Sequence, residues 1–153
     1  MTEKAIQEGI QDVIQAMDEF ANADVVINDY SPFDFSNLKA PYVIIENSDD
    51  VSSTQEGYDP VTIWNPKLIL IERFIKWKTT QDNLRDRRQA LLDEFNGHGN
   101  ARSAGGVEGV NIKKLRTSSP ILEWYDPQIA ENQRPGTFPV FLFQFLTFET
   151  WES

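Results

Sequence analysis

Residues 138–151 read Phe-Pro-Val-Phe-Leu-Phe-Gln-Phe-Leu-Thr-Phe-Glu-Thr-Trp, and this stretch decides the fold. Positions 141, 143 and 145 are all phenylalanine, while positions 140, 142, 146 and 148 are Val, Leu, Leu and Phe. Alternate residues of a strand point to opposite faces, so both faces of this strand are apolar. Such a strand is expected to lie in the centre of a sheet and to be covered on both sides.

Two amphipathic helices are predicted outside this strand. In residues 2–21, six apolar side chains recur at the i, i+3, i+4, i+7 spacing of a single helical stripe. In residues 80–96, apolar side chains follow the same period, with Thr79 as the expected N-terminal cap and Gly97 at the end. Both stripes are typical of helices that pack on a core.

Shorter apolar runs predict the remaining strands. They are expected at residues 25–27, 41–46, 61–64, 68–75 and 110–115. Residues 120–125 fit either an extended or a helical piece. The order helix, strands, helix, strands predicts an α+β fold, a mostly antiparallel sheet with helices packed on it. A length of 153 residues is expected to form a single domain, residues 1–153.

Two polar segments are expected to be mobile loops that contact partners. Residues 48–59 are polar and lack periodicity, and residues 97–109 hold five of the eight glycines. Loops of this length commonly carry function or are disordered. The candidate partner-contact residues in them are Ser52, Gln55, His98, Asn100 and Arg102.

Charge is unevenly distributed along the chain, whose net charge is −10. Residues 1–66 carry two basic and thirteen acidic side chains, residues 67–116 carry eleven and six, and residues 117–153 carry one and five. The overall acidity disfavours a free duplex-DNA binder, which needs a concentrated basic surface. The segregation has two interpretations: compensation within one folded surface, or a basic side that docks on the acidic side of another copy.

A seam between copies would use charged residues of the basic and acidic segments. Arg85 and Arg88 lie at i, i+3 on the second predicted helix, interleaved with Asp82 and Asp86, a pattern equally ordinary for a solvated helix face. The candidate subunit-interface residues are Arg85, Arg88, Asp49, Asp50 and Glu56.

No catalytic or metal-binding motif stands out. There is no cysteine, His98 is the only histidine, and the glycines around it do not form a phosphate-binding loop. Asp49 and Asp50 with Glu46 and Glu56 supply oxygen ligands for a divalent cation, but their spacing is not that of an EF-hand. A hydrolase pairing Asp49 with Glu123 stays a weaker alternative. We therefore predict a non-enzymatic protein without catalytic residues, metal or cofactor.

The layout of the chain resembles the tail terminator, or tail completion, proteins of long-tailed phages and other small head–tail joining proteins. The resemblance rests on the N-terminal helix and on four stretches: Pro-Tyr-Val-Ile-Ile at 41–45, Trp-Asn-Pro-Lys-Leu-Ile-Leu-Ile at 64–71, the helix at 85–95 and the strand at 138–148. It covers most of the chain in order and length, without a signature motif.

This resemblance implies a structural virion protein that forms a ring, usually a hexamer, on the tail tube. Such a ring ends tube growth and offers the surface on which the head docks. The implied partners are other copies of the chain, the tail tube protein and the head–tail connector protein. The genome passes through the ring without specific nucleic-acid recognition. The implied location is the head-proximal end of the virion tail, reached from the host cytoplasm.

Two further expectations complete the sequence-based picture. No apolar run approaches the roughly 20 residues needed to span a bilayer, so no membrane association is expected. The alternative function is an acidic DNA mimic that inhibits a nucleic-acid-binding enzyme. The net charge suits a mimic, whereas the basic middle segment does not, because a mimic needs long unbroken rows of carboxylates.

Overall fold

The computed structural model describes residues 3–30, 41–57, 59–74, 76–97, 99–125 and 140–153. Its helices are α1 (Glu3–Gln15) and α2 (Trp77–Asn96), with short 3-10 turns η1 (Asp18–Phe20) and η3 (Asn100–Ser103). Its strands are β1 (Asp24–Ile27), β2 (Tyr42–Glu46), β3 (Val51–Glu56), β4 (Asp59–Trp64), β5 (Lys67–Arg73), β6 (Val110–Thr117), β7 (Leu122–Tyr125) and β8 (Val140–Glu152).

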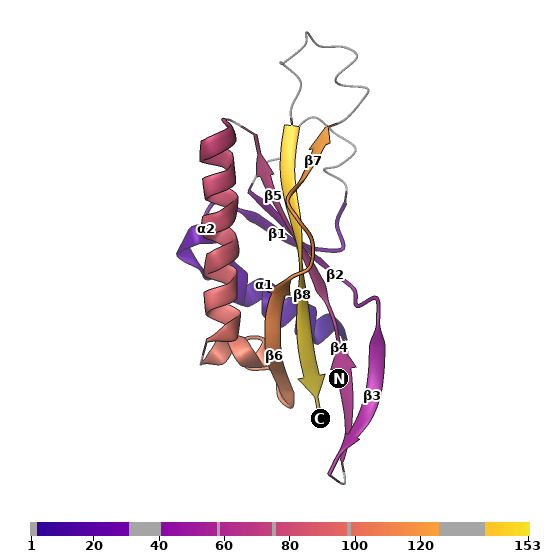
Figure 1. Cartoon of the computed structure of the whole chain (residues 1–153). Coiled ribbons are helices and arrows are strands. Elements are labelled where there is room, and N and C mark those ends of the chain that lie inside the picture. Colours follow the sequence, from indigo (N-terminus) through magenta and orange to yellow (C-terminus); the bar gives the residue numbers. More distant parts are fainter. Residues whose placement is uncertain (1–2, 31–40, 58, 75, 98, 126–139) are drawn as a thin grey trace.

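The strands form one eight-stranded sheet organised around β8 (Figure 1). Strand β8 is thirteen residues long and pairs antiparallel with β5 and then β4, and also with β7 and then β6. Because β5 and β7 both pair with residues 141–143, they lie on opposite edges of β8. Among the described strands, only β1 and β2 pair in parallel. The predicted α+β fold with a mostly antiparallel sheet is confirmed.

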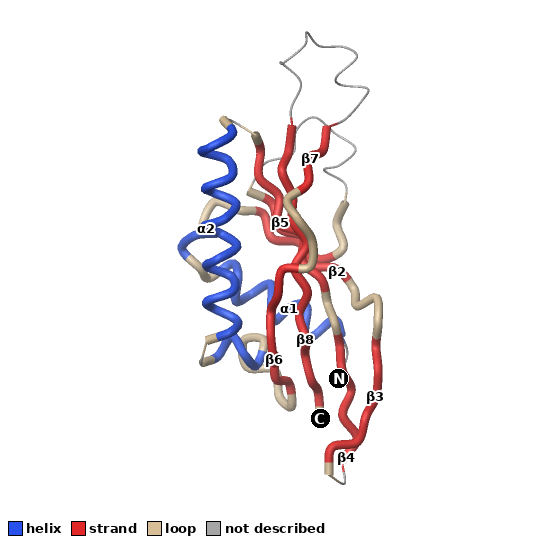
Figure 2. Tube along the Cα trace, viewed as in Figure 1, coloured by secondary structure: helices blue, strands red, loops and turns tan. Residues whose placement is uncertain are grey.

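Both helices pack on one face of this sheet and enclose the main core (Figure 2). Even-numbered residues of β8, among them Leu146 and Phe148, point into this core together with Leu91 of α2 and Ile10 of α1. The rings of Phe95 and Phe148 meet edge to face, with centroids 5.0 Å apart. This is one of the favoured geometries for aromatic pairs, and it fixes α2 over the middle of β8.

The opposite face of the sheet carries a second, smaller apolar cluster. Its buried members are Tyr42, Ile44, Ile69, Ile71 and Phe141. Phe143 and Phe145 pack against it half-buried, with ring centroids 5.9 Å apart. Strand β8 is therefore central and buries side chains on both faces, as its sequence predicts, but within the described residues helices cover only one of these faces. Residues 138 and 139, also predicted for this strand, lie outside the described residues.

The expectation of a loop at residues 48–59 is wrong, because most of this segment is the strand pair β3–β4. Residues 51–56 pair with residues 59–64 without a register shift. The turn between them uses Gly57 at a φ of +66°, a conformation that glycine adopts without a steric penalty. Residues 51–55 are all exposed, so neither face of this strand has to be apolar. The sequence therefore lacks the alternation of apolar and polar residues that would predict a strand.

The segment 97–109 is largely irregular, as expected for a loop, but two of its small side chains are anchored in the core. Ala101 and Ala104 are buried, and Ala104 packs on α1 at Gly9. A Cβ placed on Gly9 would lie 2.0 Å from the carbonyl oxygen of Ala104, so only glycine allows this approach. The contact needs small residues rather than large apolar ones, which a search for apolar runs overlooks.

The helix boundaries also differ from those predicted. Helix α1 ends at Gln15, and Met17, in extended conformation, starts η1. Helix α2 begins at Trp77, so Thr79 lies inside the first turn and does not cap it. Lys76 occupies the cap position without a side-chain hydrogen bond. Aromatic packing contributes at this end, because Trp77 meets Phe74 edge to face at 5.2 Å.

A buried ion pair joins α2 to the sheet. The Glu72 carboxylate, whose side chain is only 6% exposed, accepts a hydrogen bond from Arg87, whose Nε also donates to the Glu19 carbonyl at 3.1 Å. Burial raises the pKa of Glu72, and the charge of Arg87 opposes this rise. The effect of desolvation on this pKa is therefore larger than that of the attraction to Arg87.

Phe148→Ala is expected to lower the free energy of unfolding by about 3–5 kcal/mol, because it removes a fully buried ring and leaves a cavity beside Phe95. Phe145→Ala, which truncates a half-buried ring on the opposite face, is the control and is expected to lose clearly less. Urea denaturation measures both. Equal losses would contradict placement of the main core on the helix-covered face.

Arg87→Met is expected to lower the free energy of unfolding by about 3 kcal/mol at pH 7, because Glu72 is left buried without its partner. Losing Arg87 raises the pKa of Glu72 in the folded protein further. The loss in free energy of unfolding therefore grows as pH rises, because the buried carboxyl must be ionised without a partner. It disappears below the ordinary pKa of 4.5, where the carboxyl is protonated in both the folded and the unfolded state. Urea denaturation between pH 4.5 and 8 tests this. The double variant Glu72→Gln, Arg87→Met should lack the pH dependence, and a deficit independent of pH in Arg87→Met would contradict the argument.

Candidate functional site

The predicted site residues do not form one site. Ser52 and Gln55 are exposed on β3, while Asn100 and Arg102 lie in η3 at the end of α2. Glu56 ends β3, its side chain is not described, and His98 falls outside the described residues. Only Asp49 and Asp50, in the connection between β2 and β3, line the largest described cleft.

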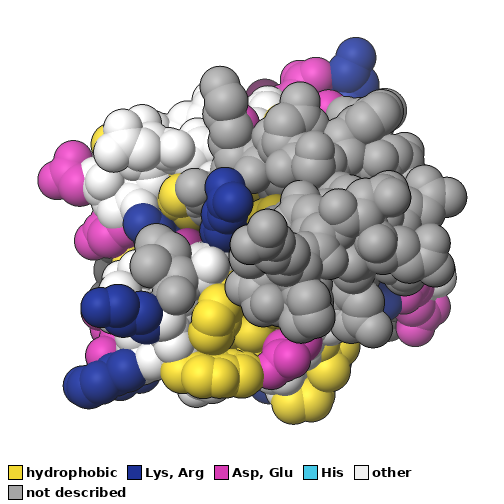
Figure 3. All heavy atoms as spheres, turned by 90° about the horizontal axis from the view of Figure 1, so that it is seen from above, with side chains coloured by type: hydrophobic (Ala, Val, Ile, Leu, Met, Phe, Trp, Pro, Cys, Tyr) yellow, Lys and Arg dark blue, Asp and Glu magenta, His cyan; other side chains and the backbone are white. Residues whose placement is uncertain are grey.

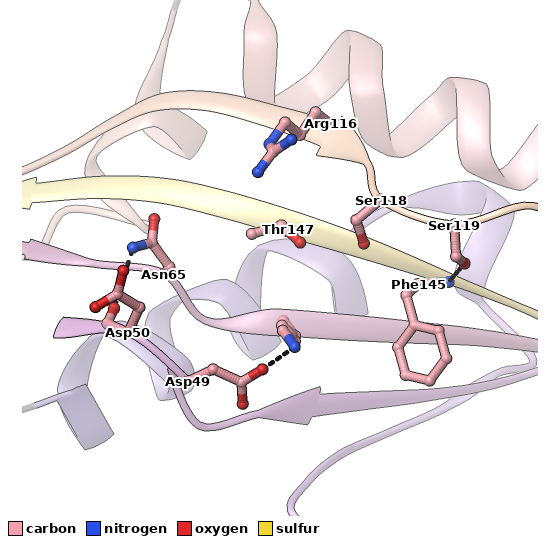
Figure 4. Close-up of a pocket in the computed structure, with 9 residues that line it drawn as sticks. Asp49, Asp50, Asn65, Arg116, Ser118, Ser119, Phe145 and Thr147 are labelled. Carbon is pink, nitrogen blue, oxygen red and sulfur yellow. Dashed lines mark hydrogen bonds and ion pairs between the residues drawn. The ribbon is translucent and has the colours of Figure 1, made fainter.

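This cleft, of about 500 Å³, lies on the face of the sheet opposite the helices (Figure 4). Phe145 and Thr147 of β8 and Lys67 of β5 form its floor. One wall carries Arg116 at the end of β6 with Ser118 and Ser119, and the other carries Asp49, Asp50 and Asn65. The cleft therefore places a basic wall opposite an acidic one.

Hydrogen bonds within the cleft are structural. Lys67 pairs with Asp49, and the Asn65 amide donates to the Asp50 carbonyl at 3.0 Å. The Ser119 hydroxyl accepts a hydrogen bond from the Phe145 backbone at 3.0 Å. Neither serine of the cleft is hydrogen-bonded to a described carboxylate or amine that would act as its base. Glu123, in β7, does not line the cleft, so the hydrolase pairing with Asp49 gains no support.

Two of the acidic residues considered for a cation, Glu46 and Asp49, have other partners. Glu46 accepts a hydrogen bond from Tyr30, and burial together with this carboxylate raises the pKa of the Tyr30 hydroxyl well above its usual range. Burial, with Asp29 and Asp24 nearby, raises the pKa of Tyr42 to about 12. Among the described residues, no three His, Cys, Asp or Glu side chains gather closely enough to hold a metal ion.

The two arginines predicted for a subunit seam have different environments. Arg85 is exposed and pairs with Asp82 and Asp86 on its own helix, so its charge is already neutralised. Arg88, expected at the surface, instead faces the sheet and donates to the side chain of Gln144, a buried residue of β8, at 3.2 Å. The surface expectation for Arg88 is wrong, because the core-facing stripe of α2 runs through Leu84, Arg88 and Leu91.

Exposed charge is distributed unevenly across the sheet, with Glu123 of β7 and Arg73 of β5 as exceptions to the pattern. On the β6 edge, three exposed basic residues follow one another, and we call them the basic row: Lys113, Lys114 and Arg116. On the other side of β8 lies what we call the acidic side: Asp24, Asp49, Asp50 and Asp59, all exposed. No ion pair joins the basic row to a described carboxylate, although Lys113 stacks over Trp151 at 4.8 Å.

Sequence reasoning overlooked the basic row as a candidate site. The signal was present, because the predicted strand at 110–115 alternates apolar residues with Asn111 and lysine, and no acid follows before residue 123. The sequence does not show that these bases lie on a sheet edge, opposite the carboxylates of residues 49 and 50.

The backbone of β6 is shielded on the side away from β8. The Asn96 amide accepts from the Leu115 N–H at 2.8 Å and donates to its carbonyl at 2.9 Å. Arg102 Nε donates to the Ile112 carbonyl at 3.4 Å. These side chains occupy backbone hydrogen-bonding positions that a neighbouring strand would use. The outer edge of β6 is therefore closed to strand addition at these positions, and contact with the basic row would involve its side chains.

A second exposed feature lies where α2 begins. Trp77 is 53% exposed, and Leu122 of β7 is 39% exposed. Figure 3 looks onto this end of the molecule, where hydrophobic and basic side chains lie next to each other in the described part of the surface.

Among the described helices, none is long and apolar enough to cross a membrane.

Comparison with known proteins adds no relative. No family model matches the chain, and no curated protein matches its sequence. The functional argument therefore rests on the residues of this chain.

Asn96→Ala is expected to lower the free energy of unfolding by about 1–3 kcal/mol, because it removes both partners of the Leu115 backbone. Gln89→Ala on the same helix, which removes an exposed contact with Asp93, is expected to change it by less than about 0.5 kcal/mol. Denaturation and amide exchange at Leu115 measure the effect. Unchanged exchange in Asn96→Ala would show that the edge is not held by this amide.

Proposed function

We propose that this chain is a non-enzymatic assembly protein whose copies form a closed ring on the tail tube of a long-tailed phage. The observation that carries the proposal is the polarity of the sheet. The basic row lies on one side of β8 and the acidic side on the other, so each subunit offers two different and complementary surfaces.

Ring closure follows from this polarity by symmetry. A two-fold dimer places the same patch of both subunits in contact, which would bring like charges together at either side of this sheet. A head-to-tail contact places the basic row against the acidic side of the next copy, and such a contact closes into a ring when its rotation permits. Complementary charge also speeds and orients the encounter of subunits.

The phage context comes from the layout of the chain, which resembles tail terminator proteins. In that role the ring caps the tail tube, stops its growth and receives the head–tail connector, with the tube protein and the connector as partners. The chain would then be found at the head-proximal end of the virion tail. The DNA-mimic alternative is less favoured, because the unpaired bases of β6 interrupt the acidic surface that a mimic needs.

Native mass spectrometry at several concentrations, with electron microscopy of particles, is the experiment that tests ring formation. We expect rings with six-fold symmetry. Assembly should weaken between about 0.1 and 1 M salt, because the Debye length shortens from about 10 Å to 3 Å. An obligate two-fold dimer under all conditions would contradict the proposal.

Charge reversal identifies the contacting sides. Lys114→Glu with Arg116→Glu is expected to abolish rings while leaving the monomer folded, because both side chains are exposed. Asp50→Lys with Asp59→Lys should do the same, and the four changes together in one chain should restore assembly. Lys78→Glu, an exposed base on α2, is the control and should assemble normally. Rings indifferent to all reversals would show that the polarity is only internal compensation.

A further inference from the structure

The described edges of the sheet are protected unequally. On β1, the Gln11 amide of α1 donates to the Val25 carbonyl at 2.8 Å. On β6, Asn96 and Arg102 cover the backbone of Leu115 and Ile112. Strand β3 ends the strand order on its side, and within the described part of the chain only β4 is hydrogen-bonded to it.

Strand β3 also lacks the features that usually guard an edge. Natural sheets protect edge strands with lysine, proline, bulges or very short length. Residues 51–55, Val-Ser-Ser-Thr-Gln, contain no charge and no proline. The strand is six residues long, pairs with β4 without a bulge, and Val51 is 48% exposed. The hairpin extends past the ends of β6 and β8, so its outer edge is accessible (Figure 1).

We propose that the outer edge of β3 accepts an extended strand from a different protein, with basic residues at both ends of that strand. Backbone hydrogen bonds to β3 would supply affinity, as in other cases of strand addition. The charges at the two ends of β3 determine which kind of strand can bind there. The exposed Asp50 directly precedes the strand, and the exposed Asp59 follows its turn, so a carboxylate lies at each end of a neutral centre.

A second copy of this chain does not fit the edge. Antiparallel pairing of β3 with β3 would bring the acidic start of the strand in one copy, at Asp50, toward the acidic turn of the other, at Asp59, at both ends of the ladder. Like charges that face each other across strands are destabilising. The one basic strand of this chain, β6, has its outer backbone covered by Asn96 and Arg102. Acidic ends thus disfavour backbone pairing between two copies of β3 and leave that backbone open to a basic strand.

A synthetic peptide tests the proposal on the full-length chain. The probe is Lys-Val-Thr-Val-Thr-Val-Lys with blocked ends, at up to millimolar concentration and low salt. We expect slower amide exchange within residues 51–56 and no change in β1 or β6. The same peptide with Glu at both ends should bind about tenfold more weakly, since each facing charge pair contributes a fraction of a kcal/mol. The same Lys peptide N-methylated at alternate amides should not bind.

Proline substitution provides a second test that depends on backbone direction. In an antiparallel strand, the N–H groups of successive residues point alternately toward the neighbouring strand and away from it. One of the variants Ser53→Pro and Thr54→Pro therefore removes an outward N–H, and should keep its thermal stability while losing peptide binding. The other should destabilise the hairpin. Ser53→Ala and Thr54→Ala are the controls and should bind normally.

Several outcomes would overturn the inference. Equal binding of the N-methylated peptide would show that no backbone ladder forms, and protection outside β3 would locate the contact elsewhere. No protection of β3 at millimolar peptide would show that the edge is closed to such strands. The peptide and proline experiments are repeated with Lys114→Glu and Arg116→Glu in the same chain, which are expected to keep it monomeric, so their outcome does not depend on whether rings form.

Discussion

The structure depends on β8, which satisfies its backbone on both edges and buries side chains on both faces at once. Its thirteen residues pair with β5 and β4 along one edge and with β7 and β6 along the other. The surfaces of the sheet are positioned by their contacts with this strand. Phe145 and Thr147 of β8 form the floor of the cleft, β6 carries the basic row, and β4 joins the exposed β3–β4 hairpin to the sheet.

The helix layer is attached to this strand by more than apolar packing. The core-facing side of α2 has Leu84, Leu91 and Phe95, but between them Arg87 and Arg88 reach buried polar groups of the sheet. Apolar contacts alone tolerate sliding of a helix along its stripe. A buried carboxylate and a buried amide do not, because each loses its partner if the helix shifts by one turn. These contacts therefore specify the register of α2 on β5 and β8.

Backbone edges and charged side chains are satisfied by neighbouring side chains in some parts of the molecule and left exposed in others. Where side chains of α1, α2 and η3 lie beside an edge, they take the place of a missing strand. On α2, bases are neutralised by acids one turn away, so that surface is neither strongly positive nor strongly negative. Exposed charge without an ion pair to another described residue remains at Lys114 and Arg116 of β6 and at Asp50 and Asp59 beside β3.

The sequence by itself determined the elements that bury apolar side chains at a regular period. Strand β8, the stripe of α1, most of α2 and the buried strand β2 were all predictable, because burial imposes periods of two or 3.6 on the residues. The α+β class followed from their order. The absence of a nucleophile paired with a base was also inferred from the sequence, and it stays a prediction.

Tertiary structure alone decided the features that leave no apolar period. Strand β3 is exposed along residues 51–55, and its conformation comes from pairing with β4. Arg88 looked like a surface residue because its amino acid type is charged, but its partner Gln144 lies 56 positions away in the chain. The polarity of the sheet arises in the same manner, since β6 and β4 meet only through β8. Contacts between distant segments depend on the whole fold, and no local pattern records them.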